Sequence, residues 1–146
     1  FLTDNAGDFF VNLSIAYVDD ERRSDTPGDP YVTIMEQERR LRSRSYLSAS
    51  WTKNDWAAGV STSRIGSMNY QSPRWDGKPN TKIDPYYDIG AFVRYDIEDG
   101  HYVALSVSNL MDDVPKKNSD LGWPWFATYY YSPVGRELFL TYRYTF

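Results

Sequence analysis

Residues 9–17 read Phe-Phe-Val-Asn-Leu-Ser-Ile-Ala-Tyr, and this stretch decides the fold class. Its odd positions carry most of the large apolar side chains, namely Phe9, Val11, Leu13, Ile15 and Tyr17. Its even positions include the polar or small residues Asn12, Ser14 and Ala16. A period of two places alternate residues on opposite faces of a β-strand. The stretch therefore predicts an amphipathic strand with one apolar face.

The same alternation returns in five further runs of the chain. Their apolar positions are Leu47, Ala49 and Trp51; Trp56, Ala58, Val60 and Thr62; Ile89, Ala91, Val93, Tyr95 and Ile97; Val103, Leu105 and Val107; and Leu138, Leu140, Tyr142, Tyr144 and Phe146. The residues between them are mostly polar or small, and no run has a convincing helical period. We therefore predict an all-β protein of about six up-and-down antiparallel strands.

The connections between these runs alternate in length. Residues 53–55 and 98–100 are predicted to form tight turns, the second of them with an Asp-Gly signal. Long polar segments without a sustained period occupy about residues 19–38, 66–84 and 112–134. Short turns at one end and long loops at the other are typical of outer-membrane β-barrels. A soluble β-sandwich does not usually sort its loops in this way.

The composition excludes several classes of function. The chain has 146 residues, which we treat as one domain (1–146), and its net charge of −4 argues against binding to nucleic acid. Because there is no cysteine, disulfides, thiol catalysis and cysteine-ligated metals are excluded. The sequence contains no nucleophile–base pair, phosphate loop or metal-ligand spacing. We therefore predict no enzymatic activity, no cofactor and no bound metal.

Aromatic residues make up 17% of the chain, and their positions bear on the membrane question. With the long loops placed outside the cell, the aromatics at the turn end fall on the apolar faces of their strands: Trp51, Trp56, Tyr95, Tyr142, Tyr144 and Phe146. Tyr17 falls at the opposite rim. Aromatic girdles at both interfaces are typical of transmembrane β-barrels. We predict an antiparallel transmembrane β-barrel segment with a polar lumen side.

Six strands are too few to close such a barrel. The smallest outer-membrane barrels have about eight strands. An open sheet in lipid leaves two edges whose backbone groups each cost several kcal/mol. We therefore expect the six strands to belong to a larger barrel.

Five segments resemble known outer-membrane proteins. The terminal run 135–146, which ends in Phe146, resembles the C-terminal signature of outer-membrane barrels. Residues 107–115 resemble the N-L-F-D-x-x-P-P segment of TonB-dependent receptors, and residues 131–137 resemble their Y-x-P-x-G-R entry to the final strand. The other two are Tyr87 to Tyr95, similar to D-L-x-x-x-Y, and 64–67, similar to Y-I-G-S. This sequence departs at Met111, Lys116 and Arg64, where the family has Phe, Pro and Tyr.

The resemblance covers residues 64–146, whereas residues 1–63 match only by strand pattern. It implies the last six strands of a barrel of roughly 22 strands whose lumen holds an N-terminal plug domain. The whole protein would import a scarce nutrient, such as a siderophore, cobalamin or oligosaccharide, across a Gram-negative outer membrane, energised through TonB. Its partners would be the remaining barrel and plug, TonB, the barrel-assembly machinery acting on Tyr142, Tyr144 and Phe146, and outer-membrane lipid with lipopolysaccharide.

Candidate ligand-binding residues come from the lumen side and the last loop. Arg40, Arg42 and Arg44 share the lumen parity, where they would line the lumen, attract an anionic ligand or pair with plug carboxylates. Loop aromatics would stack on a ligand or pack within the loop: Trp123, Trp125, Phe126, Tyr129, Tyr130 and Tyr131. The carboxylates of Asp112, Asp113 and Asp120 suit turn chemistry better than calcium. His101, which follows the Gly100 turn, is expected to face solvent.

Two alternatives remain open at this point. Another outer-membrane barrel, such as a passive channel, adhesin or surface hydrolase, would share the alternation and the final Phe146. A soluble β-domain that binds carbohydrate through Trp and Tyr would be a monomer that needs no detergent.

Overall fold

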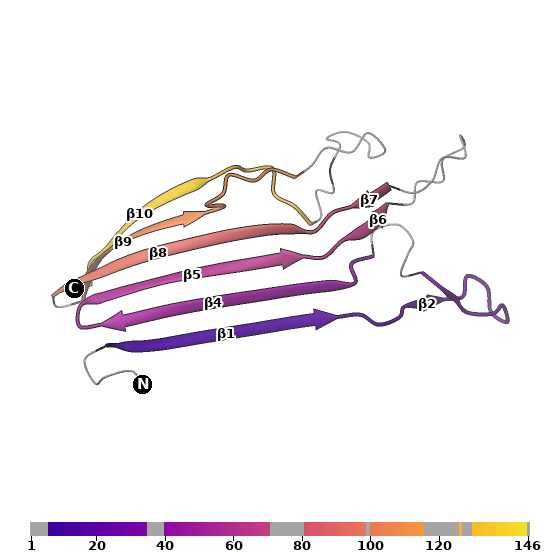
Figure 1. Cartoon of the computed structure of the whole chain (residues 1–146), viewed down its shortest axis with the longest axis horizontal. Coiled ribbons are helices and arrows are strands. Elements are labelled where there is room, and N and C mark those ends of the chain that lie inside the picture. The colour runs from indigo at the N-terminus through magenta and orange to yellow at the C-terminus, as the bar shows by residue number, and fades with distance from the viewer. Residues whose placement is uncertain are drawn as a thin grey trace.

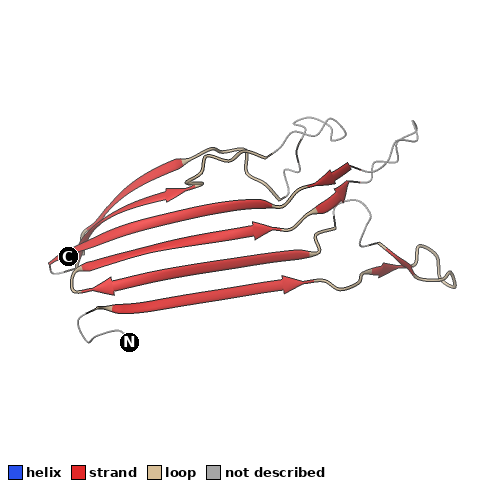
Figure 2. Ribbon diagram, in the orientation of Figure 1, coloured by secondary structure: helices blue, strands red, loops and turns tan. Residues whose placement is uncertain are grey.

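The structure, a computed structural model, describes residues 6–34, 40–70, 81–98, 100–115, 126 and 130–145. In this part of the chain all regular structure is β (Figures 1 and 2). The six long strands are β1 (Asp8–Tyr17), β4 (Ser43–Lys53), β5 (Trp56–Ile65), β8 (Tyr86–Glu98), β9 (His101–Ser108) and β10 (Glu137–Arg143). The short strands are β2 (Arg22–Arg23), β3 (Val32–Thr33), β6 (Met68–Tyr70) and β7 (Thr81–Ile83).

The six long strands form one sheet in the order β1-β4-β5-β8-β9-β10, and every neighbouring pair is antiparallel. Strands next to each other in this sheet are also next to each other along the chain, apart from the short hairpins, so the path runs up and down (Figure 1). The predicted all-β antiparallel architecture is confirmed. The sheet is open in the described residues, with β1 at one edge and β10 at the other. No helix in this part of the chain has the length and apolarity needed to cross a membrane.

Two tight turns join long strands at one end of the sheet. Asn54, in the turn between β4 and β5, has a φ of 50°, and Gly100, between β8 and β9, has a φ of 83°. Asparagine and glycine adopt this left-handed conformation most readily, which is why they suit two-residue hairpin turns. A register shift between Asp96 and Glu98 marks a β-bulge just before the second turn. We call this end of the sheet the turn rim and the opposite end the loop rim.

The long connections contain structure that the sequence pattern did not predict. At the loop rim β2 pairs with β3 and β6 pairs with β7, each as a separate two-stranded hairpin. Strands of two or three residues are too short to establish a period of two, so the sequence pattern does not reveal them. Figure 1 shows both hairpins extending beyond the six-stranded sheet.

A small apolar core lies at the loop rim. Met68 and Tyr131 are 4% and 6% exposed, and six partly buried side chains pack against them: Leu41, Ile65, Ile83, Tyr86, Phe126 and Tyr130. This cluster joins the β6–β7 hairpin to the residues that lead into β10. The apolar burial of the described residues is therefore concentrated outside the faces of the main sheet.

The final strand is shorter than predicted. We expected alternation as far as Phe146, but β10 ends at Arg143, which pairs with Tyr102 of β9. Tyr144 and Thr145 follow the strand, and the Tyr144 ring lies beside that of His101. Phe146 lies outside the described residues.

Candidate functional site

The strand register places the predicted apolar positions on one face of the sheet, which we call the apolar face. One row crosses all six strands and consists of Phe9, Trp51, Ala58, Val93, Leu105 and Leu140. The next row consists of Val11, Ala49, Val60, Ala91, Val107 and Leu138. Since directly paired residues point to the same side, six independent alternations agree on a single face.

The apolar face has no covering layer among the described residues. Leu140 is 76% exposed, Ile15 68%, and Val60, on a central strand, 56%. Soluble monomers rarely expose a continuous apolar surface across a whole sheet. We therefore treat the apolar face as the candidate contact surface of this chain.

Aromatic side chains gather along the turn rim of the apolar face. The rings of Trp56 and Tyr95, which are paired residues of β5 and β8, have centroids 4.7 Å apart. Tyr142 joins the same row through Val103 of β9. The four predicted rim residues in these strands, Trp51, Trp56, Tyr95 and Tyr142, therefore lie within two adjacent rows.

The indole of Trp51 is fixed by a close approach of the backbone. Its Nε1–H donates a hydrogen bond to the carbonyl oxygen of Ala6 at 2.7 Å. Gly7 has a φ of 84°, and a Cβ atom at that position would lie 2.8 Å from Trp51 Nε1. Only glycine accommodates both the positive φ and this contact.

His101 joins the aromatic residues of the turn rim. Its Nδ1 lies 3.0 Å from the hydroxyl oxygen of Tyr142, and its ring centroid is 4.1 Å from that of Tyr144. We expected His101 to face solvent, and it is partly exposed beside these two rings. The contact also keeps Tyr144 at the rim although β10 has already ended.

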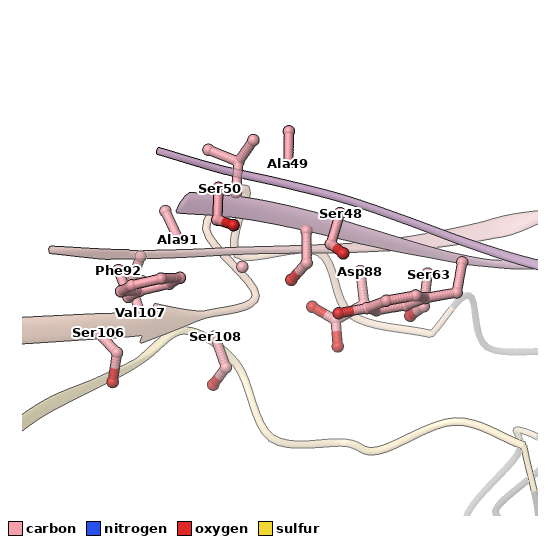
Figure 3. Close-up of a pocket in the computed structure, with 14 residues that line it drawn as sticks. Ser48, Ala49, Ser50, Ser63, Asp88, Ala91, Phe92, Ser106, Val107 and Ser108 are labelled. Atoms are coloured by element: carbon pink, nitrogen blue, oxygen red, sulfur yellow. The ribbon is translucent and has the colours of Figure 1, made fainter. Parts of the chain in front are cut away.

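The opposite face, which we call the serine face, is lined by small polar residues. Its central rows contain Ser48, Ser50, Ser61, Ser63, Ser106 and Ser108. A shallow hollow lies over these residues, with Tyr46, Asp88 and Phe92 in its lining. Figure 3 shows Ser48 and Ser50 pointing to the side opposite Ala49, as alternation along β4 requires. The hollow indicates that the sheet is concave toward this face.

One glycine of the serine face is covered by an aromatic ring. Gly59 pairs with Phe92, and a Cβ atom at Gly59 would lie 2.5 Å from Phe92 Cε1 and 3.0 Å from the carbonyl oxygen of Ala49. The ring therefore occupies the space that a side chain at position 59 would need. This arrangement is the aromatic rescue of a strand glycine.

The predicted ligand-binding arginines have different surroundings in the structure. Arg44 lies on the serine-face side of β4, paired with Ala16 and Ile65 near the loop rim. Arg42 precedes β4, and its carbonyl oxygen accepts the N–H of Val18. The Arg40 guanidinium forms an ion pair with Glu21 at 2.7 Å. Of the three, Arg40 is thus engaged within the chain.

The predicted loop aromatics are only partly described. Phe126 and Tyr130 pack against the Met68–Tyr131 core, whose Met68 belongs to β6. Trp123, Trp125 and Tyr129 lie outside the described residues.

Asn109 forms a buried polar centre at the loop rim, and the sequence pattern alone did not single it out. It is 5% exposed and has a φ of 48°. Its side-chain N–H groups donate to the carbonyl oxygens of Asp113 at 2.7 Å and Val134 at 3.4 Å. Its Oδ1 accepts the Asp113 N–H, and its own N–H donates to the Asp88 carboxylate at 3.1 Å.

Asp112 extends this network to the start of β10. Its Oδ1 accepts the Arg136 N–H at 2.8 Å, and a Cβ atom on Gly135 would lie 2.7 Å from the same oxygen. We name the set Asp88, Asn109, Asp112, Asp113, Val134, Gly135 and Arg136 the Asn109 network. It ties the end of β9 to the entry of β10 across the last loop. The Asp112 carboxylate therefore serves turn and strand-entry chemistry, while Asp120 lies outside the described residues.

The β2–β3 hairpin at the loop rim is held by side-chain hydrogen bonds. The Thr33 hydroxyl donates to Asp20 Oδ1 at 2.7 Å, and Arg22 pairs with the other oxygen of Asp20. These bonds, with that from Thr33 contributing most, lower the pKa of Asp20 below its ordinary value of 3.8.

Comparisons of this chain with protein-family models, with curated proteins and with solved structures found no match.

Proposed function

We propose that this chain forms the last part of the wall of a transmembrane β-barrel in a Gram-negative outer membrane. The barrel would be a TonB-dependent receptor that imports a scarce nutrient. The observation that supports this proposal most strongly is the register, which aligns six amphipathic strands into one exposed apolar face with aromatic residues along its rim. On this proposal the apolar face contacts lipid and the serine face lines the lumen.

The dimensions of the apolar face suit a bilayer. Tyr87 lies near the loop rim of β8 and Tyr95 near its turn rim, both on the apolar face. At about 3.4 Å per residue, the two positions are about 27 Å apart along the strand. A strand tilt of about 40° reduces this to about 21 Å in height, close to the apolar band of about 25 Å in outer-membrane barrels.

The open edges support a larger assembly. Neither β1 nor β10 has a second strand partner among the described residues. In lipid each unpaired backbone group costs several kcal/mol, so both edges require neighbouring strands. We propose that the remainder of the barrel supplies them and that a plug domain occupies the lumen.

The proposed assignment to the TonB-dependent receptors rests on the sequence resemblance to that family and on the Asn109 network. The residues that resemble the two closing motifs of the family, around Asn109 and around Gly135, meet in that network. A physical contact between two sequence-distant motifs gives a reason for their occurrence together. Tyr142, Tyr144 and Phe146 would serve the barrel-assembly machinery, and TonB would act through the plug.

Membrane residence is tested by extraction. Outer membranes from cells that express the full-length protein are washed with urea at high pH, and the protein is then solubilised in detergent. We expect the protein to resist the wash and to require detergent. A monomer that remains soluble without detergent would contradict the barrel and favour a soluble β-domain.

The receptor assignment needs a separate test. Translation of the gene upstream of the codon for Phe1 is expected to give a plug domain and a TonB box, and nutrient uptake by intact cells is expected to require TonB. A membrane-resident protein with neither feature would instead be a passive channel, adhesin or surface hydrolase.

A further inference from the structure

Arg64 places a guanidinium group on the apolar face. In the register it shares a row with Ile15, Ser45 and Tyr87, close to the loop rim. The next three rows toward the turn rim carry no charged residue on the apolar faces of β4, β5 and β8, from Leu47 to Trp51, Ala58 to Thr62 and Ile89 to Val93. Lys53 follows in the row of Trp56 and Tyr95. The Arg64 cation therefore stands at the loop-rim boundary of three uncharged rows.

Two hydroxyl groups on neighbouring strands orient this guanidinium. Arg64 Nε donates to the Tyr87 hydroxyl of β8 at 3.3 Å, and Nη1 donates to Ser43 Oγ of β4 at 3.0 Å. Gly66 makes room for the serine, since a Cβ atom there would lie 2.4 Å from Ser43 Oγ. The side chain is thus held between three strands.

The charge of Arg64 is not neutralised by these partners. Five other arginines form ion pairs with carboxylates in the described part of the chain, namely Arg22, Arg23, Arg40, Arg94 and Arg136. Both hydrogen-bond partners described for Arg64 are neutral hydroxyls. Its position and fixed orientation therefore suit an external anion.

We propose that Arg64 binds the phosphate of a membrane-lipid headgroup. This inference rests on the proposed function, because only a lipid-facing wall brings the loop rim of the apolar face to headgroup level. A planar guanidinium offers paired N–H donors that match phosphate oxygens, and a partly dehydrated boundary strengthens that bond. The neighbouring Tyr87 ring is also typical of the headgroup level.

The test measures lipid binding to the full-length protein in neutral detergent. Native mass spectrometry follows titration with diphosphoryl lipid A and, separately, with the same lipid after removal of its phosphates. One cation–phosphate contact is worth about 1 kcal/mol, so Arg64→Gln is expected to weaken binding of the phosphorylated lipid about five-fold. Binding of the dephosphorylated lipid is expected to stay unchanged.

Three further variants sharpen the result. Arg64→Lys keeps the positive charge but not the paired N–H donors of the guanidinium. Its loss of binding to the phosphorylated lipid is expected to be about half that of Arg64→Gln on a logarithmic scale. Tyr87→Phe keeps the arginine but removes one orienting hydroxyl, so a loss of about two-fold is expected. Arg143→Gln removes one charge from the turn rim on the serine face and is expected to bind like the wild type.

Two outcomes would overturn the phosphate site. One is equal binding of both lipids by the wild type, and the other is an equal loss in Arg64→Gln and Arg143→Gln. If either occurs while the protein still resists extraction by urea, only the headgroup contact is wrong. If urea extracts the protein, the lipid-facing wall itself is wrong.

Discussion

The two faces of the sheet share the same six strands but present different surfaces. On the apolar face, one row runs through Phe9, Trp51, Ala58, Val93, Leu105 and Leu140. On the serine face, the adjacent row runs through Phe10, Ser50, Gly59, Phe92, Ser106 and Phe139. The first row is apolar throughout, whereas the second combines large rings with small residues. A ring can then lie over its small neighbour, as Phe92 does over Gly59.

The two faces therefore differ in how far contacts within the sheet fix the packing of their central rows. On the apolar face, the ring contacts and side-chain hydrogen bonds lie near the two rims, so a solvent that dissolves hydrocarbon would satisfy the rows between them. The serine face has a shaped hollow and a ring seated over a glycine. A slip by one residue would exchange the two faces, and the rows therefore fix the register.

The largest expected effect comes from placing a charge on the apolar face. Val60→Arg, in a central row, is expected to reduce the free energy of unfolding by about 2–4 kcal/mol in lipid vesicles. Leu140→Arg lies one row nearer the turn rim and is expected to cost less, because the penalty falls toward the interface. The measurement is equilibrium unfolding of the full-length protein in phospholipid vesicles.

The control for this pair is Thr141→Arg, on the serine face next to Leu140. It is expected to be far milder than either variant. Equal losses at positions 140 and 141 would remove the distinction between the faces.

The second largest loss of unfolding free energy is expected at the loop rim. It tests whether polar contacts stabilise this rim, in contrast to the two faces of the sheet. Asn109→Ala removes the bonds to Asp113 and Val134 and places alanine at a φ of 48°. Each buried group left without a partner costs about 1–3 kcal/mol, so we expect a loss of about 2–4 kcal/mol in the same unfolding measurement.

Asn109→Gly separates the two causes, since glycine accepts the positive φ but makes none of the side-chain bonds. It is expected to be less destabilising than Asn109→Ala by about 1 kcal/mol. If Asn109→Ala matches Asn12→Ala, at an exposed position of β1, the network has no stabilising role.

The smallest effect concerns the ring over Gly59. Gly59→Ala is expected to destabilise the protein by about 1 kcal/mol, because the added Cβ displaces the Phe92 ring. In a Phe92→Ala background the same change is expected to be neutral. A double-mutant cycle of unfolding free energies measures the difference. An equal cost in both backgrounds would mean that the backbone contact with Ala49, and not the ring, limits this position.

The sequence was informative about strands because alternation is a local property. The runs around Leu13, Val60 and Leu105 each identify a strand and its apolar side without knowledge of any neighbour. Up-and-down order followed from the tight turns, where Asn54 and Gly100 supply the left-handed conformation.

Other features depend on contacts between distant residues. The role of Asn109 is determined by its contact with Val134, and the orientation of Arg64 by Tyr87, so neither is visible in a local pattern. The end of β10 at Arg143 is likewise not visible in the pattern, because Tyr144 continues the apolar alternation. The short strands β2, β3, β6 and β7 carry too few residues to display a period.

Cysteine labelling of intact outer membranes tests the central claim most directly, and residues 1–146 contain no native cysteine that would compete for the label. Single cysteines are placed at consecutive positions 58–63 of β5 in the full-length protein. They are then treated with a small water-soluble maleimide and, separately, with a lipid-soluble one. We predict that cysteines at 58, 60 and 62 react with the lipid-soluble reagent only, while those at 59, 61 and 63 are protected from it. Uniform reaction with the water-soluble reagent along the strand would contradict the account.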